Sequence, residues 1–227
     1  MPAATARARV RAELTLEIKQ AARRQLAETG ASGLSLRAVA REVGMVSSAV
    51  YRYFPSRDAL LTALIVDSYN SAADAAQAAE AECSRADRRA RFLAVCVGLR
   101  GWAVGAPQEW ALIFGSPVPG YAAPTDTIDP AARIPLLLLA IIGEAPAADS
   151  PAADSIPASV SPDLRALRDA LAPALDEPVT ARAIMAWTQL VGSISFELFG
   201  HLNNVIHDYP AYFEYQMGRI ADDLGLA

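Results

Sequence analysis

The stretch that decides the fold is residues 33–60, GLSLRAVAREVGMVSSAVYRYFPSRDAL, which holds two short helical patterns separated by almost nothing. In each pattern the apolar residues recur at the spacing of one helix face. They are Leu36, Val39, Ala40 and Val43 in the first pattern and Val46, Val50 and Phe54 in the second. Ser35 can cap the first helix and Gly44 can end it. Either Val46 or Ser47 can open the second helix. Two helices joined by a short turn that contains Gly predict a helix-turn-helix.

The face of the second helix opposite its apolar residues carries hydroxyls, a phenol and a guanidinium. These groups can hydrogen-bond phosphates or base edges in a DNA major groove, and residues at helix starts suit phosphate contacts. The same pattern also fits an ordinary helical hairpin with a solvated face, so the residues alone leave both open. The predicted DNA-contacting residues are Ser35, Arg37, Ser47, Ser48, Tyr51, Arg52, Tyr53 and Arg57.

Residues 43–61 resemble the DNA-binding domain of the TetR (tetracycline-repressor-like) family of transcriptional regulators. They carry a Gly in the turn at Gly44, a Tyr-x-x-Phe pair at Tyr51 and Phe54, and a basic residue, Arg57, at the start of the next helix. The resemblance implies an all-α regulator that binds a palindromic operator in double-stranded DNA as a homodimer. It also implies a helical body that responds to a small effector.

Charge is distributed unevenly along the 227-residue chain, whose formal net charge is -5. Residues 1–60 hold 10 Lys and Arg against 5 Asp and Glu, whereas residues 61–227 hold 10 against 20. A basic head on an acidic body suits a DNA-binding module joined to a domain that does not bind DNA.

The predicted fold is all-α, with a three-helix helix-turn-helix domain at residues 12–64 and a larger helical bundle for ligand binding and dimerisation at residues 65–227. Residues 1–11, with three arginines among alanines, are predicted to form a flexible basic arm that either contacts DNA or merely adds charge. Residues 143–163 are rich in Ala, Pro, Ser and Asp without a period, which predicts a surface loop.

Several function classes are disfavoured by what the chain lacks. Its two cysteines, Cys83 and Cys96, indicate neither a disulfide framework nor a metal site. The longest apolar run, residues 134–142, is too short to span a bilayer, so a cytoplasmic protein is expected. Neither a catalytic Ser-His-Asp set nor a phosphate-binding loop is found, so we expect no enzyme and no cofactor.

The body contains one helical pattern, residues 178–204, that leaves almost no polar face and must be covered on all sides. With a last helix at about residues 210–224, two chains would form a four-helix dimer interface, as the TetR family does. Alternatively, these residues simply fill one core. The predicted interface residues are Gly192, Ser195, Phe196, Phe199, Tyr212 and Met217.

Large aromatic residues on separate helices of the body predict an apolar pocket for a small hydrophobic effector, although they would equally fill a plain core. Residues 107–115 and 187–192 resemble the ligand-binding domain of a TetR subgroup named for a Trp-His-Gly motif, with Val191 in place of the His. The predicted ligand-binding residues are Leu99, Trp102, Trp110, Phe114, Trp187 and Val191.

The function that the sequence favours is a DNA-binding repressor released from its operator by a small hydrophobic effector. A regulator that binds no ligand and responds to a protein partner remains open. So does a helical-bundle enzyme or carrier that bears an unused hairpin.

Overall fold

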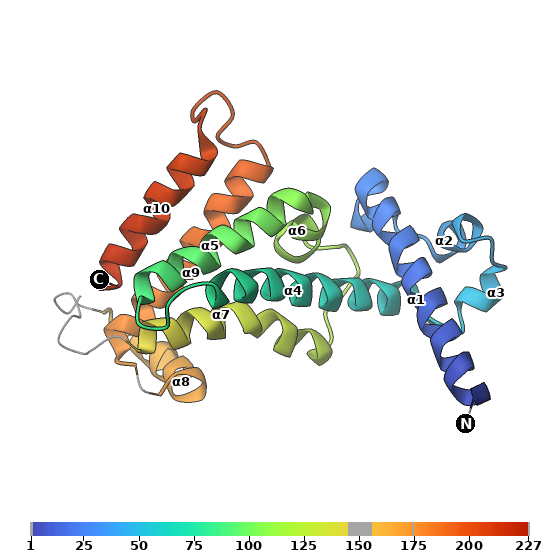
Figure 1. Cartoon of the computed structure of the whole chain (residues 1–227), viewed down its shortest axis with the longest axis horizontal. Helices are drawn as coiled ribbons and strands as arrows, with labels where there is room; N and C mark the ends of the chain where they lie inside the picture. The colour runs from blue at the N-terminus through green and yellow to red at the C-terminus, as the bar shows by residue number, and fades with distance from the viewer. Residues whose placement is uncertain (1, 145–155, 174, 227) are drawn as a thin grey trace. The chain divides into compact units, whose positions relative to one another are not determined.

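The computed structural model of the chain is described for residues 2–144, 156–173 and 175–226, and all regular structure in them is helical (Figure 1). This confirms the predicted all-α fold. The chain divides into two compact units. Unit 1 comprises Met1–Tyr69 and Ala106–Ile128, and unit 2 comprises Asn70–Gly105 and Asp129–Ala227. None of the helices in the described residues is both long and apolar enough to cross a membrane.

Unit 1 is built on the helix-turn-helix. Its helices are α1 (Pro2–Thr29), α2 (Leu36–Glu42), α3 (Ser47–Val50), the first half of α4 (Arg57–Ala81) and α6 (Pro107–Phe114). Gly44 has a φ of 66°, a left-handed conformation that a glycine adopts without strain and that turns the chain between α2 and α3. The core is formed by residues that include Ile18, Leu26, Leu36, Val39, Val50, Phe54, Leu60, Leu61 and Leu64.

Two details of the helix-turn-helix differ from the sequence prediction. Val46 was expected to point into the core with Val50 and Phe54, but it is the N-cap residue of α3 and is 70% exposed. Its backbone is extended, so the helical spacing that relates Val50 to the core does not apply to it. Ser35 is the N-cap of α2, yet its hydroxyl makes no capping bond; instead its backbone N–H donates to Gln25 Oε1 at 3.3 Å.

The predicted flexible arm at residues 1–11 is wrong for residues 2–11, which form the first turns of α1. Alanine and arginine have high helix propensity, and proline is favoured at the first helical position, as at Pro2. Residues 2–11 therefore extend the helix of residues 12–29 toward the amino terminus.

Unit 2 is a bundle of α5 (Arg88–Gly105), α7 (Ile128–Gly143), α8 (Ser161–Leu171), α9 (Glu177–Leu198) and α10 (Tyr209–Asp223), with the second half of α4. Helix α10 packs against α5 and α9. Side chains cap the last two helices: Asp176 accepts from the N–H of Val179 and Asp208 from that of Ala211. Helix α9 ends six residues before the predicted boundary, shortly before Gly200, whose φ is 76°.

The apolar run at residues 134–142 lies inside α7, a helix that the sequence analysis did not assign. Of the predicted loop, residues 145–155 lie outside the described residues, and the loop ends earlier than predicted because Ser161 begins α8.

An ionic cluster is buried among α4, α5 and the end of α7. The Arg91 side chain is only 1% exposed, and its Nε donates to Glu80 Oε1 at 2.5 Å. Its Nη1 pairs with Glu144, and the exposed Arg85 reaches both carboxylates. The Arg91 guanidinium lowers the pKa of Glu144, chiefly through their hydrogen bond. A buried charge is tolerated only when it is paired in this way.

Candidate nucleic-acid interface and ligand pocket

Helix α3 and the turn after it present polar side chains on one side and apolar ones on the other. Val50 is fully buried and Phe54 is 7% exposed, so both anchor the segment to the core of unit 1. Tyr51 is 45% exposed, and Ser48 and Arg52 are exposed as well. The exposed set can donate and accept hydrogen bonds to phosphates and base edges, as expected for a recognition helix.

The remaining predicted contacts are less uniform in their exposure. Ser47 and Ser35 are half-buried, and Arg37 is exposed on α2. Tyr53 is half-buried and packs against the core of unit 1, and the guanidinium carbon of Arg11 lies 5.2 Å from the centre of its ring. Arg11 Nη2 also donates to the carbonyl of Arg52 at 3.4 Å. Arg11 and Arg52 are 41 residues apart, so helical periodicity could not predict this contact between the first turns of α1 and the end of the recognition segment.

The Arg57 side chain forms two hydrogen bonds and an ion pair within unit 1. Its Nη2 donates to the carbonyl of Ala31 at 2.8 Å and its Nε to that of Leu34 at 3.2 Å, while Nη1 pairs with Asp58 at 3.4 Å. The guanidinium therefore joins the start of α4 to the 3-10 turn η1 (Ala31–Gly33) and to Leu34, which follows it. A phosphate contact by Arg57 stays a prediction, and the geometry gives the side chain a structural role as well.

Arg57→Ala is expected to lower the free energy of unfolding by about 1–2 kcal/mol, because two backbone carbonyls lose a charged donor that is partly screened by solvent. Urea unfolding followed by circular dichroism measures the change. Arg57→Lys keeps the charge but lacks the planar fork, so it should restore only part of the loss. Wild-type stability in Arg57→Ala would contradict the structural role.

A charged cluster joins α1, α4 and α6 within unit 1. Lys19 Nζ lies 2.9 Å from Asp67 Oδ1, and Arg23 pairs with both Asp67 and Glu109, at 3.1 and 3.2 Å. Ser68 is fully buried and donates to Glu109 at 2.7 Å. From the sequence alone, Lys19 and Arg23 on α1 are interpreted as part of a solvated face. Their i, i+4 spacing on α1 placed them together, but their partners lie more than forty residues away.

The predicted ligand-binding residues are divided between the two units. In unit 1, Trp110 is fully buried and its ring lies 4.4 Å from that of Phe114, which makes an edge contact with Tyr69. In unit 2, Leu99 is fully buried and Trp102 Nε1 donates to Ser71 at 3.0 Å. Trp110 and Leu99 thus have little surface left for a ligand.

Trp187 is the one predicted ligand-binding residue that lines the apolar pocket between α7, α8 and α9, while its neighbour Val191 on α9 is half-buried and not part of that lining. The pocket has a volume of about 250 Å³. It is lined by Pro135, Leu138, Leu139, Leu167, Arg168, Leu171, Ala172, Thr180, Ala183, Ile184 and Trp187. Nearly all of these side chains are apolar, which is the composition of sites for hydrophobic small molecules.

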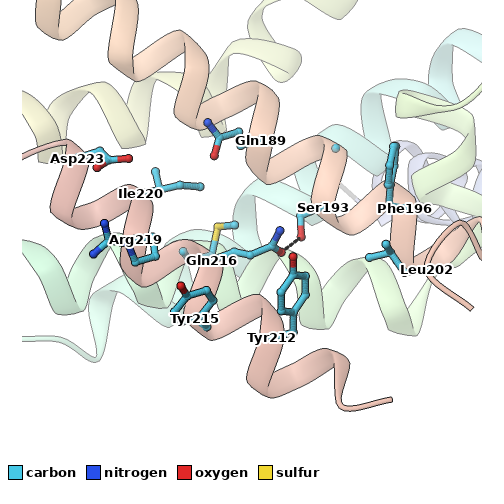
Figure 2. Close-up of a pocket in the computed structure, with 12 residues that line it drawn as sticks. Gln189, Ser193, Phe196, Leu202, Tyr212, Tyr215, Gln216, Arg219, Ile220 and Asp223 are labelled. Carbon is cyan, nitrogen blue, oxygen red and sulfur yellow. Dashed lines mark hydrogen bonds between the residues drawn. The ribbon is translucent and has the colours of Figure 1, made fainter. Parts of the chain in front are cut away.

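A second hollow of unit 2 is an open groove of about 530 Å³ between α9 and α10 (Figure 2). Ser193 and Gln216 form a hydrogen bond of 2.7 Å on its floor. Phe196 and Tyr215 line the groove and are 52% and 64% exposed, an unusual amount for aromatic side chains. Tyr215 is not among the interface residues predicted from the sequence.

The other predicted interface residues vary in how much surface they offer. Phe199 is 44% exposed, and Ser195 and Tyr212 are half-buried. A Cβ on Gly192 would meet nothing within 4 Å, so this stretch of α9 has open space above it. Met217 is only 1% exposed, so it packs mainly in the core of its own chain, although it also lines the groove.

Comparisons with known proteins cover both units. Residues 18–64 match the family model of bacterial regulatory proteins of the tetR family, and residues 92–220 match the tetracyclin repressor-like C-terminal domain. The chain is 42% identical over 193 residues to the HTH-type transcriptional regulator Rv1816 of Mycobacterium tuberculosis (strain ATCC 25618 / H37Rv). The aligned residues cover 84% of this chain and 82% of that protein.

Solved structures share the fold. The crystal structure of SCO4313 has a TM-score of 0.73 and 34% identity, and the match covers 93% of this chain and 97% of that one. The TetR family transcriptional regulator PfmR from Thermus thermophilus has a TM-score of 0.57 at 14% identity, over 89% of this chain and 96% of that one.

The helix-turn-helix of unit 1 and these matches define a DNA-binding transcriptional regulator, not an enzyme. The chain belongs to the TetR family.

Proposed function

We propose that this regulator is a homodimeric, cytoplasmic repressor that leaves a palindromic operator when a small hydrophobic effector binds. The observation that carries the proposal is the polar, exposed face of α3, held on a buried apolar face, in a chain whose unit 2 has an apolar pocket and an exposed aromatic groove. Each of the three features supports one part: DNA reading, effector binding and pairing.

Base reading is assigned to the exposed residues of the recognition segment. Ser48 on α3, and Tyr51 and Arg52 directly after it, are exposed side chains that can donate hydrogen bonds to base edges in the major groove. A phosphate contact is assigned to Arg37, which is exposed on α2. Base contacts carry sequence preference, whereas phosphate contacts carry affinity without it.

Pairing is assigned to the groove between α9 and α10. Exposed aromatic rings such as Phe196 and Tyr215 are favoured at protein interfaces and costly to leave in water. A two-fold axis would place the same face of each chain against the other. Two recognition helices related by that axis would read two half-sites about one turn of DNA apart, which is why the operator is expected to be palindromic.

Effector binding is assigned to the pocket of α7, α8 and α9. Helix α4 contributes Arg57–Tyr69 to unit 1 and Asn70–Ala81 to unit 2, so one continuous helix belongs to both the DNA-binding unit and the unit with the pocket. The dimer would have one arrangement that binds DNA and one that does not. An effector releases DNA only if its affinity for the second arrangement is higher than its affinity for the first.

The DNA that the purified protein retains from a random pool of duplexes tests the proposal. Sequencing should yield an inverted repeat with half-sites about ten base pairs apart. A pool without enrichment would contradict specific operator binding. An enriched sequence without two-fold symmetry would contradict the dimeric mode of reading.

Tryptophan emission tests the pocket. A lipophilic compound that fills it should quench the emission of Trp187, so Trp187→Phe should lose most of the quenching while Trp102→Phe keeps it. Fluorescence titration measures both variants. Ala183→Leu, which adds bulk to the pocket wall, should weaken binding. If the quenching survives in Trp187→Phe, the compound binds outside this pocket. If the compound quenches the emission but does not release the operator, the pocket does not control DNA binding.

A further inference from the structure

One stripe of α1 changes its chemistry along the helix. At the periodicity of an α-helix, positions 7, 11, 14, 18 and 22 fall on one face. Ile18 and Ala22 on this face are fully buried, and Leu14 is half-buried. Toward the amino terminus the same stripe continues as Arg11 and Arg7. The face is thus apolar where it covers the core and basic where it runs past the core.

Arg11 shows which part of unit 1 lies next to the basic end of the stripe. Its guanidinium donates to the carbonyl of Arg52 and lies over the ring of Tyr53, both at the end of the recognition segment. Arg7 is one helical turn further out, about 6 Å along the axis. Figure 1 shows the first turns of α1 running on past α3 within this unit.

The opposite face of these turns is neutralised internally. Arg9 is about half a turn around the helix from Arg7, and its Nε lies 3.6 Å from Glu13 Oε1. Arg7 is exposed and, in the part of the chain that is described, makes no ion pair or hydrogen bond.

We propose that Arg7 binds a backbone phosphate of the operator outside the base pairs read by α3, so that the first turns of α1 form a second DNA contact. The proposal rests on the proposed function only in requiring that α3 faces DNA. Duplex DNA presents a charge every 1.7 Å or so along its axis, and a guanidinium pairs with phosphate oxygens through two parallel hydrogen bonds. A phosphate contact is independent of sequence, so it adds affinity and lengthens the bound site without adding base preference.

Arg7→Ala and Arg9→Ala form a matched pair of variants. Both remove one positive charge from the same two turns, and both introduce the strongest helix former. For a phosphate contact, Arg7→Ala should bind a long duplex of random sequence about 3- to 10-fold more weakly, and the slope of log affinity against log salt should fall by about one per subunit. Arg9→Ala should stay within about twofold of wild type. Circular dichroism checks that both variants keep the wild-type helix content.

Duplex length locates the contact. On a duplex trimmed to the base pairs protected by the recognition helices, wild type and Arg7→Ala should bind equally, because the outer phosphate is gone. If Arg7→Ala and Arg9→Ala lose the same affinity for the long duplex, the loss comes from the change in net charge, and the proposal is overturned. A loss in Arg7→Ala that persists on the trimmed duplex would overturn it as well. Failure of the proposed function is separate: a wild type that prefers no sequence would refute operator binding, yet the comparison on random duplex would still decide the role of Arg7.

Discussion

Phe196→Glu is expected to convert the proposed dimer into monomers at micromolar concentration. The ring is 52% exposed in the single chain and lines the groove between α9 and α10. A two-fold interface contains each residue twice, so one substitution removes two aromatic anchors, at about 2–4 kcal/mol each, and brings two carboxylates together. Light scattering should then report the 24.0 kDa chain rather than twice that mass. Operator affinity should fall with it, because a monomer reads one half-site.

Val97→Glu is the control for this experiment. Val97 is 45% exposed on α5 and is not part of the groove, so the added charge should leave the dimer intact. Met217 is unsuitable as an interface probe, because its side chain is buried and a charge there would unfold unit 2. A Phe196→Glu protein that still scatters as a dimer would move the interface to another face.

Arg91→Ala is expected to lower the free energy of unfolding by about 3 kcal/mol or more. Removing one partner of a buried ion pair leaves the other charge without compensation, and Glu80 is 7% exposed. Arg85, whose side chain is 71% exposed, still reaches Glu80 and limits the loss. Urea unfolding measures the difference. Arg91→Met, which keeps most of the apolar stem, separates the lost charge from lost packing.

Arg85→Ala is the matched control, because it removes the exposed member of the same cluster and should cost less than about 1 kcal/mol. The pH dependence gives a second readout. The pKa of Glu144 is lowered by Arg91, so its contribution is complete above its usual pKa and is lost as pH falls through the lowered value. In Arg91→Ala this acid-dependent loss should shrink. Equal losses of stability in the Arg91→Ala and Arg85→Ala variants would contradict the buried role of Arg91.

The sequence by itself determined the helix-turn-helix, the bounds of α6 and the family. The helix-turn-helix follows from the spacing of Leu36, Val39 and Val50 and from the turn at Gly44, since periodicity, caps and a left-handed glycine are properties of neighbouring residues. The bounds of α6 follow from Pro107 at its start and Gly115 after its end. The exposed polar face of the recognition segment was also predictable, because burial of Val50 and Phe54 places Tyr51 and Arg52 outside.

Only the tertiary structure decided which distant groups meet. Helical spacing put Lys19 and Arg23 on one face, but it could not show that Asp67 and Glu109 lie opposite them. The sequence predicted Arg57 as a phosphate contact, and it could not show that this guanidinium donates to the carbonyls of Ala31 and Leu34. Met217 was expected at an interface and lies in the core. The sequence does not show whether an apolar side chain is covered by its own chain or by a second copy. The reason is that the hydrophobic effect has no direction and depends on the apolar area removed from water.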